Sequence, residues 1–262
     1  MEDLLRLLQA AKVYDLSQSY FVGMPHHPSH PPFLFSLTKK HGDSVMPNGG
    51  SSTSEALGLG GHLGTHMDAL CHFSCNGKVF GGQPVVQSYE AGVEPCSIEK
   101  VEPIFRRGVL LDIAGQQRVE TLPEDFEISA AHIEQASAAQ GVQISAGDVV
   151  LLRTGWARFW RDAARFLNQF RGPGPAEEGA HWLSSRQIFA AGSDTIAFEL
   201  VPSQTMPVHV HLLVESGIHI IECLNLEQLA AEKVYEFVFI ATPLKIRGGT
   251  GSPIRPLAIK SL

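Results

Sequence analysis

One stretch, "GGHLGTHMDALCHFSCNG" at residues 60–77, constrains this chain more than any other feature of its sequence. It gathers three histidines, one aspartate and two cysteines among several glycines. Gly60, Gly61 and Gly64 disfavour a helix by roughly 1 kcal/mol each relative to alanine. We therefore expect the chain to run extended after Gly64, with its side chains alternating between two faces.

In such an extended segment the polar side chains share one face. His66, Asp68 and His72 fall on it, and His62 can approach them across the turn at Gly64. The opposite face is apolar and consists of Met67, Ala69, Cys71 and Phe73. This pattern predicts a half-buried strand whose polar side lines a site.

Two imidazoles and a carboxylate form a suitable ligand set for Zn²⁺, Mn²⁺ or Fe²⁺, with positions left for water and substrate. A divalent ion lowers the pKa of bound water from 15.7 to about 7. From its position alone, His72 is either a fourth ligand or a base that takes a proton and returns it to a leaving nitrogen. A structural zinc site built from Cys71, His72 and Cys75 is a weaker alternative, because no second cysteine pair is present.

A second polar cluster lies in "PVHVHLLVESGIHIIECLNLEQL" at residues 207–229, which holds His209, His211, His219 and Glu222. Glu222 ends an apolar run, and a carboxylate there is costly unless it is paired or bound to a cation. The cluster is therefore a candidate to complete the metal site. The sequence leaves open whether one ion or two are bound.

An organic substrate would also need apolar walls. Phe21, Met24 and Phe73 are candidates for such apolar wall residues. Plain core packing explains these three side chains equally well.

Alternating strands and helices from about Gly108 onward predict an α/β fold. The expected strands are 108–114, 148–154, 195–200, 218–222, 236–241 and 254–259. The expected helices are 129–141, 155–170, 184–192 and 206–217. No linker divides the sequence, so we expect one domain over residues 1–262.

Charge and composition exclude other classes. The net charge is −7 and no block of lysine or arginine stands out, which argues against a nucleic-acid partner. No apolar run approaches the ~20 residues that cross a membrane. Four scattered cysteines are too few for a disulfide framework, so a reducing, cytoplasmic location is expected.

The segment "HLGTHMDALCH" resembles the H-x-G-T-H-x-D-x-x-x-H signature of the cyclase family of metal-dependent hydrolases, which includes bacterial kynurenine formamidases and isatin hydrolases. Further similar segments occur in the family's order over nearly the whole chain: "VYDLSQSYFVGMP", "LLRTGW", "GSDTIAFE" and "PLKIRGGTGSPIRPLAI".

The resemblance implies a single swivelling β/β/α domain that forms a homodimer or homotetramer and binds one or two divalent ions, Mn²⁺ or Zn²⁺. It implies that His72 is the catalytic acid and base. The implied metal ligands are His62, His66, Asp68, His209 and Glu222. The spacing from His209 to Glu222 is one residue longer than the family pattern, so His211 competes with His209.

Two departures from the family pattern, Leu70 for a proline and Cys223 for an asparagine, bear on the substrate. The leading interpretation is hydrolysis of an amide or lactam C–N bond in a small molecule, as in isatin hydrolase. The alternatives are an arylformamidase acting on N-formyl-L-kynurenine, a non-catalytic metal-binding scaffold, and an oxygenase with a two-histidine, one-carboxylate iron site.

Overall fold

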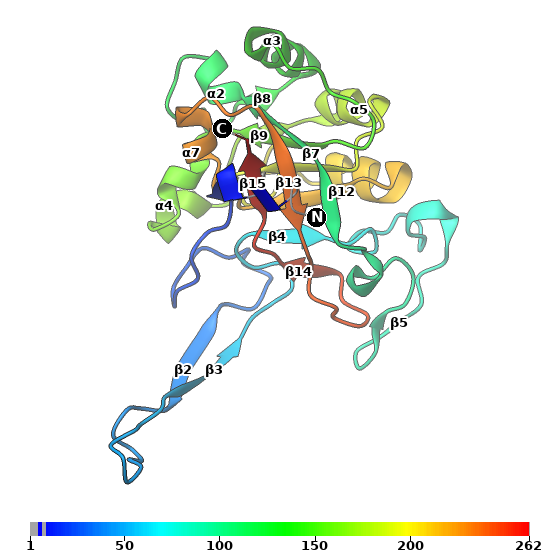
Figure 1. The fold of residues 1–262 in the computed structure, drawn as a ribbon. Helices are drawn as coiled ribbons and strands as arrows, with labels where there is room; N and C mark the ends of the chain where they lie inside the picture. The colour runs from blue at the N-terminus through cyan, green and yellow to red at the C-terminus, as the bar shows by residue number, and fades with distance from the viewer. Residues whose placement is uncertain (1–4, 7–8, 262) are drawn as a thin grey trace.

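The computed structural model describes residues 5–6 and 9–261, and a nine-stranded mixed sheet forms its centre (Figure 1). In spatial order its strands are β1 (Lys12–Asp15), β15 (Leu257–Lys260), β13 (Glu236–Ala241), β7 (Ile104–Asp112), β9 (Val149–Arg153), β11 (Ala190–Ser193), β12 (His219–Glu222), β4 (His66–Asp68) and β14 (Gly251–Pro253). The four central strands β7, β9, β11 and β12 run parallel, and the outer pairs are antiparallel. The predicted α/β class is confirmed.

Both faces of the sheet are buried at residues 108–111 of β7 and throughout β9, because these segments are almost entirely apolar. In β7, Val109 and Leu111 pack into a core with the helices, whereas Leu110 packs into a second core with β13 and β15. The helices are α2 (Ile113–Gln116), α3 (Ala130–Gln140), α4 (Ala163–Leu167), α5 (Glu177–Ser185), α6 (Pro207–His209), the π-helix η4 (Val210–Ser216) and α7 (Glu227–Ala231). Three short 3₁₀ helices are η1 (Phe80–Gly82), η2 (Ile98–Lys100) and η3 (Trp156–Phe159).

Several predicted elements are confirmed. Helix 129–141 is α3, with the Ser129 hydroxyl accepting from the His132 N–H and Gly141 closing the helix at φ 66°. The strands expected at 148–154, 218–222 and 236–241 are β9, β12 and β13. The helix expected at 206–217 is α6 followed by the π-helix η4.

Other expectations are wrong. The helix expected at 155–170 is interrupted: η3 ends before Asp162, whose carboxylate caps the separate helix α4. The helix expected at 184–192 is instead the end of α5 and then β11, since Gln187 takes a positive φ of 54° and the next residues pair with β9 and β12. Residues 195–200 form no strand, because Phe198 also takes a positive φ, 51°.

A hairpin of β2 (Leu34–Lys39) and β3 (Ser54–Gly58) extends away from the body of the molecule (Figure 1). Its side chains are largely exposed, including Phe35 and Leu57, which face each other across the hairpin register. The remaining short strands pair as β5 (Gln87–Ser88) with β6 (Gly92–Val93), and β8 (Glu127–Ile128) with β10 (Gly174–Pro175). Within residues 5–6 and 9–261, no helix has the length and apolar character that a membrane crossing requires.

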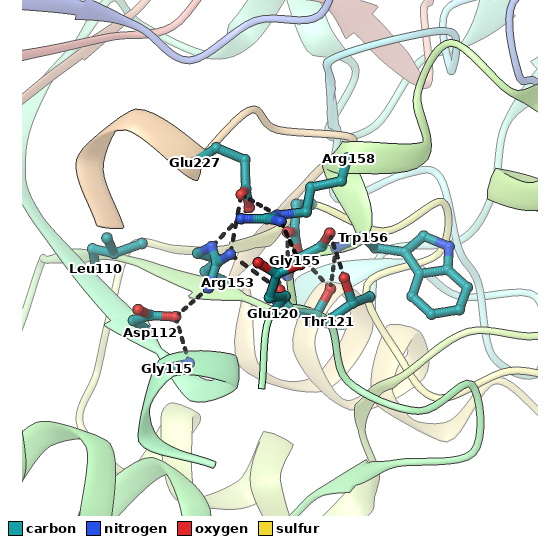
Figure 2. Close-up of polar contacts among 12 residues, drawn as sticks. Leu110, Asp112, Gly115, Glu120, Thr121, Arg153, Gly155, Trp156, Arg158 and Glu227 are labelled. Atoms are coloured by element: carbon teal, nitrogen blue, oxygen red, sulfur yellow. Dashed lines mark hydrogen bonds and ion pairs between the residues drawn. The ribbon is translucent and has the colours of Figure 1, made fainter. Parts of the chain in front are cut away.

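A buried ion-pair network joins the ends of the parallel strands to α7 (Figure 2). Arg153, at the end of β9, donates to Asp112 Oδ1 at 2.8 Å and to both Glu227 oxygens at 2.7 and 3.0 Å. Arg158 donates to the same Glu227 carboxylate at 2.7 Å and pairs with Glu120 at 3.0 Å. Both guanidinium groups therefore have carboxylate partners.

Candidate metal and catalytic site

A cavity of about 330 Å³ lies beside β4 and β12. The histidines of the signature line it together with further polar residues and a group of apolar side chains. The lining residues are His27, Ser29, His30, His62, His66, His72, Phe73, Phe170, Ile196, Ala197, Ser203, Met206, His209 and Glu222.

Strand pairing brings the two sequence clusters together. β4 supplies His66 and Asp68, and β12 places Glu222 directly opposite His66 in antiparallel register. His66 Nε2 lies 3.5 Å from Asp68 Oδ1 and 3.4 Å from Glu222 Oε2. The two motifs, more than 150 residues apart, thus form one buried site.

The turn before β4 brings in His62, whose Nδ1 lies 2.7 Å from Asp68 Oδ1. The turn depends on Gly64, which has φ 62° and packs so closely that an added Cβ would lie 2.4 Å from the Tyr20 ring. A second contact holds the other side of the His62 ring, since Nε2 lies 2.9 Å from Thr250 Oγ1.

His72 reaches the site by a turn and not along a strand. β4 ends at Asp68, and the His72 N–H donates to Ala69 O at 2.9 Å. The His72 ring then stacks on His62, with centroids 3.9 Å apart. The expectation of a strand through residue 73 is therefore wrong, and the turn also places Phe73 in the cavity wall.

The competition between His209 and His211 is decided by their surroundings. His209 Nε2 lies 3.4 Å from Glu222 Oε1, and its Nδ1 lies 2.5 Å from Glu199 Oε2. His211 instead contacts Glu215 and Ser184, each at 2.8 Å. The spacing from His209 to Glu222 is one residue longer than the family pattern. The π-helix η4 accommodates a longer segment, because each of its hydrogen-bonded turns contains one residue more than a turn of an α-helix.

The donor set fits a divalent ion. Two groups of side chains each place three donor atoms within 4.8 Å of one another: His62, Asp68 and His72, and Asp68, His209 and Glu222. Asp68 belongs to both groups, and its Oδ2 is buried without a hydrogen-bond partner in the described part of the chain. Leaving a buried carboxylate oxygen unpaired is costly, and a bound cation would satisfy it.

The electrostatics of the site also favour a cation. Burial opposes the charged form of His66, but the hydrogen bond and charge of Asp68, with the charge of Glu222, raise its pKa to about 9. Burial likewise opposes the charged form of His209, yet Glu199 and Glu222 raise its pKa to about 10. Without a metal ion the site therefore holds protons where a cation would bind, and metal binding should release them.

His72 differs from these two histidines. Burial lowers its pKa to about 3, although the charge of Asp68 opposes this. The imidazole of His72 is therefore neutral near pH 7, as a proton acceptor must be.

Burial also raises the pKa of Glu222.

The structure separates the three expected substrate-binding residues. Phe73 lines the cavity, whereas Met24 is buried in the neighbouring hydrophobic cluster and Phe21 packs against that cluster. The segment 24–33 contributes His27 and His30 to the cavity instead.

Sequence reasoning also missed Glu199, which is 2% exposed and hydrogen-bonds to His209. The accumulation of histidines in "MPHHPSHPPF" was a visible signal for the cavity wall. For Glu199 the only signal was a carboxylate in an otherwise apolar segment, "TIAFEL".

Comparisons with known proteins show which family the chain is similar to. The model of the family described as "Putative cyclase" matches residues 14–200. The isatin hydrolase of Roseibium aggregatum is 30% identical over 209 residues, covering 77% of this chain and 72% of that protein. A kynurenine formamidase of Bacillus thuringiensis subsp. konkukian is 25% identical over 251 residues, covering 95% of this chain and 97% of that protein.

A solved structure described as a novel cyclase superposes with a TM-score of 0.89 at 29% identity, covering 99% of this chain and 90% of that one. The chain therefore belongs to the putative cyclase family. The resemblance noted in the signature is confirmed, and the fold agrees with it.

Proposed function

We propose that this protein is a metal-dependent hydrolase that cleaves the C–N bond of a small amide or lactam, as its relative isatin hydrolase is named to do for isatin. The observation that carries the proposal is the buried, unpartnered Oδ2 of Asp68 at the centre of two overlapping ligand groups. Family membership supports the same conclusion.

The proposal assigns the metal and proton-transfer roles to side chains in or next to the cavity. His62, His66 and Asp68 would hold one divalent ion, and Asp68, His209 and Glu222 would hold a second. When bound, such an ion supplies Lewis-acid polarisation and a water of lowered pKa. The neutral His72 imidazole accepts the proton of the attacking water and returns it to the leaving nitrogen.

The cavity favours a neutral, ring-bearing substrate. Its walls include Phe73, Phe170, Ile196 and Met206, and none of the described residues that line it is arginine or lysine. N-Formyl-L-kynurenine carries a carboxylate, which would find no arginine or lysine among the described residues that line the cavity. A neutral lactam needs no such partner. The cavity therefore favours hydrolysis of a lactam over hydrolysis of N-formyl-L-kynurenine.

The test uses protein stripped of metal and reloaded separately with Mn²⁺ and Zn²⁺. We expect turnover of isatin to exceed that of N-formyl-L-kynurenine with at least one of the two ions. The reverse preference would support the arylformamidase alternative. Tight metal binding with no turnover across a panel of amides, lactams and lactones would support the scaffold, and activity that disappears without oxygen would indicate an oxygenase.

We also propose that the protein forms a homodimer or homotetramer through the hairpin of β2 and β3. A two-stranded hairpin is marginally stable alone in water, and this one carries exposed apolar side chains at Phe35, Leu37 and Leu57. Light scattering on the wild type and on Phe35→Ser with Leu57→Ser would test this. A wild-type monomer would contradict it.

A cytoplasmic location and a single domain complete the proposal. The four cysteines are free, which suits a reducing compartment. The nine-stranded sheet draws strands from Lys12 to Lys260, which supports one domain. Cell fractionation and limited proteolysis would test these two points.

A further inference from the structure

We infer that Glu199 is a positioning residue that sets which nitrogen of His209 faces the cavity, and thereby sets the affinity of the site for a divalent cation. The inference rests on the proposed function, because it assumes that His209 is a metal ligand. It concerns a side chain that lies behind the ligands and does not line the cavity.

The first observation is the way Glu199 holds His209. A single oxygen, Oε2, accepts both from the His209 backbone N–H at 3.0 Å and from the ring Nδ1 at 2.5 Å. Because a carboxylate can only accept, the proton of the ring lies on Nδ1. The other ring nitrogen, Nε2, faces Glu222 Oε1, 3.4 Å away, in the group that also contains Asp68. A cation bound there would replace the proton that Nε2 carries toward Glu222 in the metal-free site.

The second observation is that the chain is shaped to place this carboxylate. Phe198, directly before Glu199, is fully buried and has φ 51°, which is uncommon for a bulky residue. Gly174 packs so tightly here that an added Cβ would lie 2.2 Å from Phe198 O and 2.4 Å from the Glu199 carbonyl carbon. The Leu200 N–H donates to Pro175 O at 3.1 Å.

These contacts explain why residues 195–200 do not continue as a strand. A strand would alternate its side chains between two faces, whereas the positive φ at Phe198 turns the chain at Glu199. Strain held at a buried position indicates that the position has a function. The residue held there is the one that contacts His209.

A second histidine–glutamate pair in the same helical segment provides an internal control. His211 Nδ1 lies 2.8 Å from Glu215 Oε2, but Glu215 is exposed and His211 does not line the cavity. In both pairs a glutamate oxygen contacts the Nδ1 atom of a histidine. The pairs differ in the burial of the glutamate and in the group that lies opposite the histidine Nε2 atom.

The experiment measures the dissociation constant and stoichiometry of Mn²⁺ on metal-free protein, by competition with a fluorescent chelator. The variants are Glu199→Gln, which keeps the shape and one acceptor oxygen, Glu199→Leu, which removes both, and Glu215→Gln as the control. Thermal unfolding of each metal-free variant checks that the fold is intact.

Loss of an outer hydrogen-bond partner of a metal-bound histidine weakens metal binding by about 10–100-fold. We expect Glu199→Gln near the lower end of that range, Glu199→Leu near the upper end, and Glu215→Gln unchanged. If Glu199→Leu does not fold, Glu199→Gln decides the question.

Mn²⁺ affinity in Glu199→Gln equal to that of Glu215→Gln would overturn the inference while leaving the proposed function intact. A wild-type protein that binds no divalent ion would overturn the proposed function itself. The two failures are thus distinguishable.

Discussion

The Arg153 network and the histidine-lined cavity are two clusters of charged and polar side chains that are built on different principles. In the network around Arg153, every nitrogen of that guanidinium donates to a neighbouring oxygen of Asp112, Glu227 or Glu120 (Figure 2). In the cavity, histidines surround Asp68, whose Oδ2 has no hydrogen-bond partner among the described residues.

The difference distinguishes a structural cluster from a binding site. The Arg153 network contains its own positive charge, so it is complete within the chain. The grouped histidine and carboxylate side chains of the cavity could instead hold a cation, which would satisfy the unpartnered Oδ2 of Asp68. Substitutions in the two clusters should therefore affect different measurable properties.

The largest effect is expected for Asp68→Asn, because Asp68 belongs to both ligand groups. A metal contributes several kcal/mol to transition-state stabilisation, so turnover should fall by about 10³-fold or more. Elemental analysis of the purified variant should show the loss of the ion. Full metal content with normal turnover would show that Asp68 is not needed to hold the ion. The contrast between the cavity and the Arg153 network would then be wrong.

The next effect is expected for His72→Ala, which should separate chemistry from metal binding. Its neutral imidazole is assigned the proton transfer, a contribution of about 10²–10⁴-fold. Metal content should stay near that of the wild type while kcat falls. Near-normal kcat would show that another group moves the proton.

Arg153→Met should act on stability alone. Asp112 would lose its ion-pair partner, whereas Glu227 would keep Arg158. The cost should therefore lie near or below the lower end of the about 3–5 kcal/mol that is typical for breaking a buried ion pair. Urea unfolding should show this loss, and the Mn²⁺ affinity of the folded variant should match the wild type. A large change in affinity would mean that the two clusters are coupled.

The smallest effect is the acid sensitivity of the Arg153 network. Burial opposes ionisation of Glu227, but Arg153 and Arg158 lower its pKa below the ordinary value for glutamate. Ionised Glu227 therefore contributes fully to stability at pH values above the ordinary pKa of glutamate. This contribution disappears as the pH falls through the lowered pKa of Glu227. The urea midpoints of wild type and Glu227→Gln should converge toward low pH, whereas a constant gap would contradict this linkage.

The sequence predicted that His62, His66 and Asp68 lie together, because the geometry that joins them is local. His62, His66 and Asp68 lie within seven residues, and a glycine turn followed by a short strand brings them together. The sequence could not show whether His209 or His211 joins them, since that depends on how the helix before β12 is wound.

The errors in the fold come from long-range pairing. Residues 190–193 have a helical local pattern, but they form strand β11, which pairs with β9 on one side and with β12 on the other. Residues 195–200 look like a strand, yet Gly174 and Pro175 pack against a turn there. The cavity walls were likewise hard to predict, because Phe170 and Met206 come from separate loops.

The π-helix between His209 and Glu222 has a wider consequence. In an α-helix one added residue would rotate everything beyond it by roughly 100° and carry one member of the pair out of reach. The wider winding of residues 210–216 absorbs such a residue within a single turn. A chain of this kind can vary in length between His209 and Glu222 while the two side chains stay within reach of each other.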